Sequence, residues 1–391
     1  MQLTKIIAAS ILGLLLVQYA YAGPKEQAYT IFNRLNGVPP DSETLHQLEQ
    51  MISQGDLKGA ALAAINDKNG QFYELVHQNV TTWTNEDQQV RYPLTDYSAT
   101  VLGMIRDELP FNEVLTGDIV YIGISPDPNN PLPPYTIGRI NNSSDDHYEE
   151  IQRRAYPLHK VLVRKKQSEL TYLPTDATAG ILTTRGFARA YYVAGTNRAA
   201  TRFTFMTFLC RDMEELSDNS RPDYRVRRDV SRAPAGDPKT YKSKCAGCHS
   251  GMDGHTGAFA YMDYTEEDGL IYNPTAPRAK FNQNADEFPK GYVTTDDNWI
   301  NLWAEDGPNK SLGWNGARSG KGVKSWGKML TQTDAFSQCM AQRALVMVCD
   351  VNPEEDEVKG AINQLAAGFR ANNNYNMKAL FAKSALYCRG K

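Results

Sequence analysis

Apolar side chains recur at helical spacing through the first part of the chain. Tyr29, Phe32 and Leu35 form one apolar stripe, which Gly37 ends. The same kind of pattern predicts four further helices, over residues 41–52, 56–65, 72–83 and 97–109. Because short turns separate them, these segments predict an antiparallel helical cluster.

The pattern changes in the middle of the chain and then becomes helical again. Residues 126–134 are rich in proline and asparagine, as in a linker, and follow a brief β-type run at 119–124. Residues 161–164 and 170–173 flank a polar turn and predict a β-hairpin. Helical periodicity then predicts helices over residues 187–193, 198–216, 326–330, 334–348, 353–369 and 377–387. A short helix is also expected over residues 237–244, with Asp237 as N-cap and Pro238 at its first position. Residues 264–325 show little periodicity and hold three tryptophans.

These patterns predict a mainly α protein with a minor β-hairpin between two helical parts. A helical N-terminal domain is expected at 23–125, a linker with the hairpin at 126–184, and a second helical domain at 185–391.

Residues 1–22 have the features of a cleavable secretory signal. Lys5 is followed by an apolar run at 6–17, which is too short to span a bilayer, and Ala20-Tyr21-Ala22 forms an A-x-A cleavage site. No other long apolar run occurs, so we expect a soluble protein that is periplasmic or otherwise exported, with no integral membrane segment after cleavage. The formal net charge of −3 gives no reason to expect nucleic acid as a partner.

The chemically most informative stretch is Cys245-Ala246-Gly247-Cys248-His249. Two cysteines two residues apart, followed at once by histidine, are typical of c-type haem attachment. Each thiol can form a thioether bond to one vinyl group of the porphyrin, and His249 can bind iron as the proximal ligand. Half of a zinc site and a redox-active CxxC are the alternatives, but a second ligand pair and a βαβ context are missing from the sequence. Export strengthens the prediction, because attachment of haem is completed outside the cytoplasm.

Four cysteines remain when Cys245 and Cys248 are assigned to haem, and in an exported protein they predict up to two disulfides. Cys339 and Cys349 lie ten residues apart on one predicted helix, too far along it to pair with each other. Each is therefore expected to pair with Cys210 or with Cys388. Pairing Cys349 with Cys388 would connect the C-terminal helices.

Several segments resemble exported cytochrome c-like proteins of the planctomycete type. The most specific is the haem block, which resembles that family's CxxCHxxMDPLGFALENFD, although Gly254 stands where the family has proline. The resemblance implies a cytochrome c-like C-terminal domain with one covalent haem c, and electron transfer with a redox partner protein that is not identified. The resembling segments are residues 32–40, 109–118, 179–184, 196–210, 245–263 and 336–348.

A second axial ligand would come from methionine or histidine between the motif and the last core helix. Met329 is the tentative distal ligand because it lies just before that helix, and Met262 and His255 are the runners-up. An arginine-rich stretch at 221–232 is interpreted mainly as a solvated loop, in which one or two arginines pair with the haem propionates.

Three functions fit this pattern. The first is a mono-haem electron carrier, favoured because one haem motif stands without an evident catalytic constellation. The second is a haem-dependent oxidoreductase with an open distal site, which needs an acid or base beside the iron. The third is a structural or binding protein in which the haem domain is an accessory to the N-terminal helices.

Overall fold

The computed structural model describes residues 22–83, 94–136, 146–193, 195–222, 237–282, 292–371 and 374–390. The expected secretory signal lies outside the described residues apart from Ala22. Over the described ranges the protein is mainly helical, with small antiparallel sheets of two strands each. No helix within these ranges is long and apolar enough to cross a membrane.

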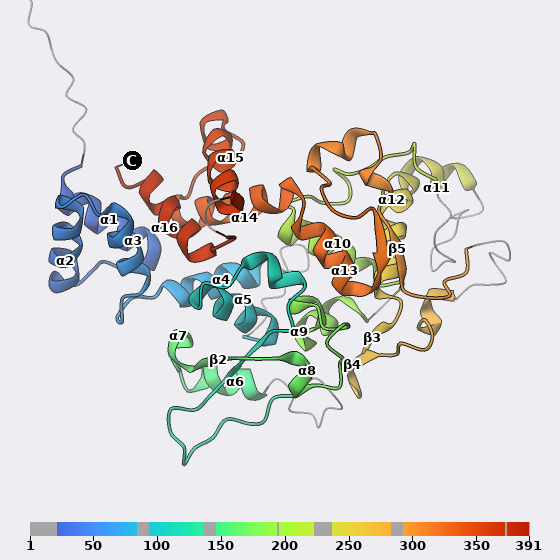
Figure 1. The fold of residues 1–391 in the computed structure, drawn as a ribbon, viewed down its shortest axis with the longest axis horizontal. Coiled ribbons are helices and arrows are strands. Elements are labelled where there is room, and N and C mark those ends of the chain that lie inside the picture. The colour runs from blue at the N-terminus through green and yellow to red at the C-terminus, as the bar shows by residue number, and fades with distance from the viewer. Residues whose placement is uncertain are drawn as a thin grey trace, which may run out of the picture.

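The N-terminal part forms the predicted cluster of helices (Figure 1). Local sequence signals set the ends of the helices. The Asp41 side chain accepts a hydrogen bond from the Thr44 amide, and Gly37 ends the first helix in the left-handed conformation with φ of 68°. The helices are α1 (Pro24–Asn36), α2 (Ser42–Ser53), α3 (Leu57–Ile65), α4 (Phe72–Trp83) and α5 (Asp96–Arg106).

The middle of the chain folds around one pair of strands. Its elements are η2 (Phe111–Leu115), β1 (Val120–Gly123), α6 (Asp146–Arg153), α7 (Leu158–Val161), β2 (Leu162–Lys165) and α8 (Gln167–Leu170). Strand β1 pairs antiparallel with β2, and Val120 lies opposite Lys165.

The predicted hairpin between residues 161–164 and 170–173 is therefore wrong. The first of these segments is a strand, but its partner is β1. Residues 170–173 form no strand, because side chains there bond locally: the Thr171 hydroxyl donates to the carbonyl of Gln167 at 2.7 Å and accepts from the Leu173 amide. Gln167 itself is buried and donates to the carbonyl of Ile119. These contacts are local, so residues 170–173 do not form a second strand beside β2.

The C-terminal half contains more short elements than its sequence predicts. Strand β3 pairs with β4 and β5 pairs with β6, within the stretch expected to be irregular. Between residues 180 and 321 the elements are η3 (Gly180–Thr183), α9 (Arg185–Tyr191), α10 (Arg198–Phe208), α11 (Pro238–Lys244), α12 (Ala246–Thr256), η5 (Gly257–Phe259), β3 (Met262–Thr265), β4 (Gly269–Tyr272), η6 (Ala279–Asn282), β5 (Asn298–Ile300), η7 (Leu302–Ala304), η8 (Pro308–Leu312) and β6 (Ser319–Lys321). Four helices follow: α13 (Gly322–Thr331), α14 (Asp334–Cys349), α15 (Asp356–Ala371) and α16 (Met377–Tyr387).

Two disulfides connect distant helices. Cys210 bonds to Cys339 and Cys349 bonds to Cys388, so the expectation that each cysteine of α14 pairs outside its helix is confirmed. The helix predicted over residues 198–216 is shorter than expected, because α10 ends at Phe208. Cys210 has a φ of 52°, a conformation that does not continue a right-handed helix.

Helix α16 packs against α1 and α3 and lies with the N-terminal helices although it is the last helix of the chain (Figure 1). Lys378, at its start, is buried and donates to the carbonyl of Arg106 at 2.7 Å. The second disulfide holds α16 to the end of α14. The two ends of the chain therefore contribute to one helical cluster.

Candidate haem-attachment site

The CxxCH stretch lies at a junction of two helices. Helix α11 begins as its sequence predicts, with Asp237 as N-cap accepting from the Lys239 amide at 2.9 Å and with Pro238 in the first turn. It ends at Lys244, and Cys245 is the residue before α12. Cys248 and His249 lie in the first turn and a half of α12. Cys248 and His249 are thus held by a regular helix, and Cys245 is the N-cap residue of that helix.

Cys245 and Cys248 are free thiols, whereas the other four cysteines form the two disulfides. Both are only partly buried. The Cys248 thiol donates to the carbonyl of Met213 at 3.3 Å. Burial raises the pKa of the Cys248 thiol, and the nearby negative charges of Glu214 and Asp212 raise it further.

His249 is linked to a carboxylate one helical turn further on. Its Nδ1 lies 3.3 Å from Oδ1 of Asp253, and Arg198 Nε lies 3.0 Å from the same oxygen. The Asp253 side chain is 2% exposed, and those of His249 and Arg198 are each 15% exposed. A carboxylate accepts and cannot donate, so Nδ1 carries the proton in this contact. Nε2 is then the nitrogen with a lone pair for a metal.

The sequence reasoning missed Asp253 and Arg198. A signal for Asp253 was present, because a residue four positions after His249 lies on the same face of a helix. Arg198 lies 55 residues upstream, on α10, and gave no such signal. Its approach to α12 depends on how the two helices pack.

A segment at 213–221 covers the first turn of α12. The Asp218 amide donates to the carbonyl of Gly247 at 2.9 Å, and the Ser250 hydroxyl donates to the carbonyl of Asp218. A Cβ on Gly247 would lie only 2.0 Å from Oγ of Ser217, so the glycine permits this close approach. The segment fixes Gly247 and Cys248 from one side.

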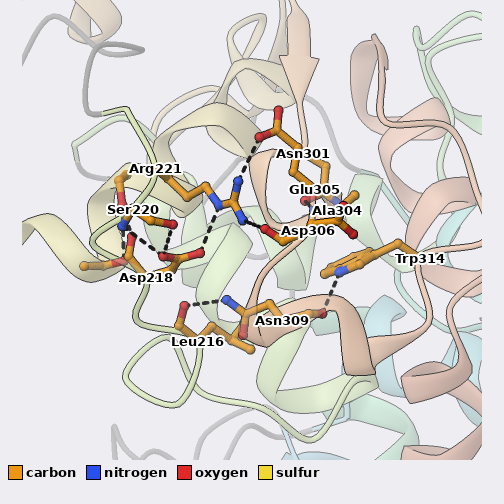
Figure 2. A network of polar contacts seen from close by, with 12 residues as sticks. Leu216, Asp218, Ser220, Arg221, Asn301, Ala304, Glu305, Asp306, Asn309 and Trp314 are labelled. Atoms are coloured by element: carbon orange, nitrogen blue, oxygen red, sulfur yellow. Dashed lines mark hydrogen bonds and ion pairs between the residues drawn. The ribbon is translucent and has the colours of Figure 1, made fainter.

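Polar contacts tie this covering segment to the chain at 305–314 (Figure 2). Arg221 donates from Nε to Asp218 at 2.9 Å, from Nη1 to Glu305 at 2.8 Å and from Nη2 to the carbonyl of Asp306. Asn309 donates to the carbonyl of Leu216, which is next to Ser217. The segment is therefore anchored at several points.

These contacts bear on the prediction that an arginine pairs with the haem propionates. Arg221 is 9% exposed and three of its nitrogens donate to protein oxygens, so its charge is already matched by carboxylates. The other arginines of the stretch lie outside the described residues. They are Arg225, Arg227, Arg228 and Arg232.

Two of the three tentative distal ligands meet around Asn301. Met329 is 2% exposed and its sulfur lies 3.6 Å from Nδ2 of Asn301. His255 is fully buried, and its Nδ1 accepts from Trp326 Nε1 at 2.9 Å. The Asn301 side chain also neighbours the His255 ring. Met262, the third, is buried in β3.

The rings around His255 form an aromatic cage. They belong to Phe205, Trp303, Trp314 and Trp326, with ring centroids 5.4–6.5 Å from that of the imidazole. Burial lowers the pKa of His255 to about 3, so the ring is neutral at physiological pH. The cage includes Trp303 and Trp314, two of the three tryptophans in the stretch at 264–325 that shows little periodicity.

The structure does not bring this cluster to His249. His255 follows His249 by six residues on α12, which places it about 9 Å further along the axis and on a different face. One helix cannot direct both imidazoles to opposite sides of one porphyrin ring. Met329 belongs to the same cluster, because its sulfur also contacts Asn301. The identity of the distal iron ligand therefore stays a prediction.

The donors present fit a covalently attached haem. Two thiols at the required spacing are free and partly accessible, and the adjacent imidazole has its Nδ1 engaged and its Nε2 left to bind iron. Over the described ranges no three His, Cys, Asp or Glu side chains converge to hold a metal ion directly. A zinc site built on the CxxC would need such a group.

Comparisons with known proteins add no family to this picture. No family model, curated protein or solved structure matches the chain. The resemblance to planctomycete-type cytochrome c-like proteins therefore stays a prediction from its residues.

Proposed function

We propose that this chain is an exported mono-haem c-type cytochrome that transfers electrons. Cys245 and Cys248 bind one haem c covalently, and His249 is the proximal iron ligand. The observation that carries the proposal is which of the six cysteines are bonded and which are free. Four form disulfides, and the two left free are those of the CxxCH motif. Disulfides form in oxidising compartments, so they also support a periplasmic or otherwise exported location.

The protein contributes a rigid attachment site. The haem, when bound, supplies a one-electron couple between ferrous and ferric iron. Helix α12 fixes the directions of Cys248 and His249, and the covering segment at 213–221 holds the turn between the two cysteines. The contact with Asp253 holds the imidazole in one orientation, which limits the reorganisation that accompanies electron transfer.

The distal ligand is proposed as before, with Met329 first and Met262 and His255 as alternatives. In the described arrangement the Met329 sulfur faces Asn301, and the His255 Nδ1 is occupied by Trp326. Each of these ligands would have to exchange its present contacts for iron.

A second candidate function is a haem-dependent oxidoreductase with an open distal site. Two observations favour it. A carboxylate bonded to the proximal imidazole raises the basicity of the ligand, which stabilises oxidised iron. The proposed distal ligands are also engaged elsewhere in the fold.

The test is an absorption spectrum of the exported full chain with a pyridine haemochrome, recorded with and without carbon monoxide. We expect a c-type haemochrome that the Cys245→Ala/Cys248→Ala variant loses. The matched control is Cys349→Ala/Cys388→Ala, which also removes two cysteines and keeps the haem. A reduced spectrum unchanged by carbon monoxide supports the electron carrier, and ready binding supports the oxidoreductase. Wild type without haem, in a host competent for haem attachment, refutes both.

A further inference from the structure

We propose that Asp253 is the positioning residue of His249 and that Arg198 sets the strength of its effect. Asp253 keeps the imidazole proton on Nδ1 and thereby presents Nε2 for ligation. It also lowers the reduction potential of the iron. The position of the proton on His249 depends on the chain alone, whereas the effect on the reduction potential rests on the proposed function.

The geometry favours a persistent contact. His249 and Asp253 lie one turn apart within α12, so the helix itself brings the two side chains together. The 3.3 Å between Nδ1 and Oδ1 is slightly longer than the usual N–H···O distance. Because the Asp253 side chain is 2% exposed, water competes little for its oxygens. A neutral histidine that donates from Nδ1 must keep its lone pair on Nε2.

Arg198 opposes the effect of Asp253 on the imidazole. Its Nε lies 3.0 Å from Oδ1, the same oxygen that His249 contacts. The guanidinium therefore draws charge away from the oxygen that accepts from the imidazole. Removal of Asp253 should weaken electron donation from His249 to the iron, and removal of Arg198 should strengthen it. A general destabilisation of the helix would change this donation in the same direction in both variants.

The first measurement is the tautomer of His249 by nitrogen NMR on the full chain as purified, if it carries no haem. We expect the proton on Nδ1 in the wild type and a shift of the population towards the Nε2–H form in Asp253→Asn. Because this measurement needs no haem, it tests the role of Asp253 even if the proposed haem function is wrong.

The second measurement, on haem-loaded protein, is the reduction potential with the iron–histidine vibration by resonance Raman. Asp253→Asn should raise the ratio of reduced to oxidised protein at least tenfold at the wild-type midpoint, or 59 mV for one electron, and weaken the iron–histidine bond. Arg198→Gln should shift both properties the other way.

The control is Asp263→Asn, which removes another ion-paired carboxylate, bonded to Arg278 and Lys280 on a different element. It should leave the tautomer and the potential unchanged. If Asp253→Asn does not fold, the double variant Asp253→Asn/Arg198→Gln removes both charges together and should also raise the potential. Unchanged potential and tautomer in the Asp253 variants, or shifts of the same sign on removing Asp253 and Arg198, overturn the proposal.

Discussion

The buried imidazole of His255 should make the protein sensitive to mild acid. The ring is fully buried in its aromatic cage, and its Nδ1 accepts from Trp326. Protonation would place a hydrogen on that nitrogen, against the indole N–H, and would put a charge where water cannot reach. Burial accordingly lowers the pKa of His255 from its usual 6.5 to about 3.

The sign and size of the effect follow from proton linkage. Between pH 6.5 and pH 3 the unfolded chain binds a proton at this site and the folded chain does not, so folding stability falls as the pH falls. The stabilisation is present above pH 6.5 and lost progressively below it. A difference of 3.5 pKa units corresponds to about 5 kcal/mol over the whole window, and to about 2 kcal/mol between pH 7 and pH 5.

The assay is urea-induced unfolding of wild type and His255→Asn at pH 7, 6 and 5. Asparagine keeps an acceptor near the position of Nδ1 but does not titrate in this range. We expect the variant to be less stable at pH 7, because the smaller side chain leaves a cavity, and to lose about 2 kcal/mol less than wild type on going to pH 5.

Other buried histidines do not obscure this difference. Burial lowers the pKa of His77 to about 4, but this residue is present in both proteins and its contribution cancels. His46→Asn, at an exposed ring on α2, is the matched control and should follow the wild type at each pH. Equal losses of stability in wild type and His255→Asn would contradict this prediction, because they would mean that the ring is not excluded from water.

Two further predictions concern stability. Gly251→Ala should destabilise the protein by about 1–3 kcal/mol, because the new Cβ would lie 1.9 Å from the ring of Trp303. Gly360→Ala meets nothing within 4 Å and should stabilise the protein by up to about 1 kcal/mol. Thermal unfolding of both variants checks this, and a stabilised Gly251→Ala would contradict it. Replacing Cys349 and Cys388 by alanine opens a loop of 39 residues and should lower the free energy of unfolding by about 4 kcal/mol in urea titrations, so an unchanged midpoint would contradict the packing of the last helix.

The local features of this fold could be predicted from the order of residues along the chain. Caps and apolar stripes predicted most helices, including α11 with Asp237 as its N-cap, because these signals act over a few residues. The CxxCH motif defined the candidate attachment site for the same reason. Helix length alone excluded a bond between Cys339 and Cys349, since ten residues of helix separate them by about 15 Å.

The fold, rather than any local signal, sets which distant segments meet. It paired β2 with β1 rather than with its neighbour, joined Cys210 to Cys339, and placed α16 among the first helices. It also brought Arg198 to Asp253 and enclosed His255 in tryptophans. Such contacts depend on how whole apolar faces fit together, and this fit is not encoded in any short stretch of the chain.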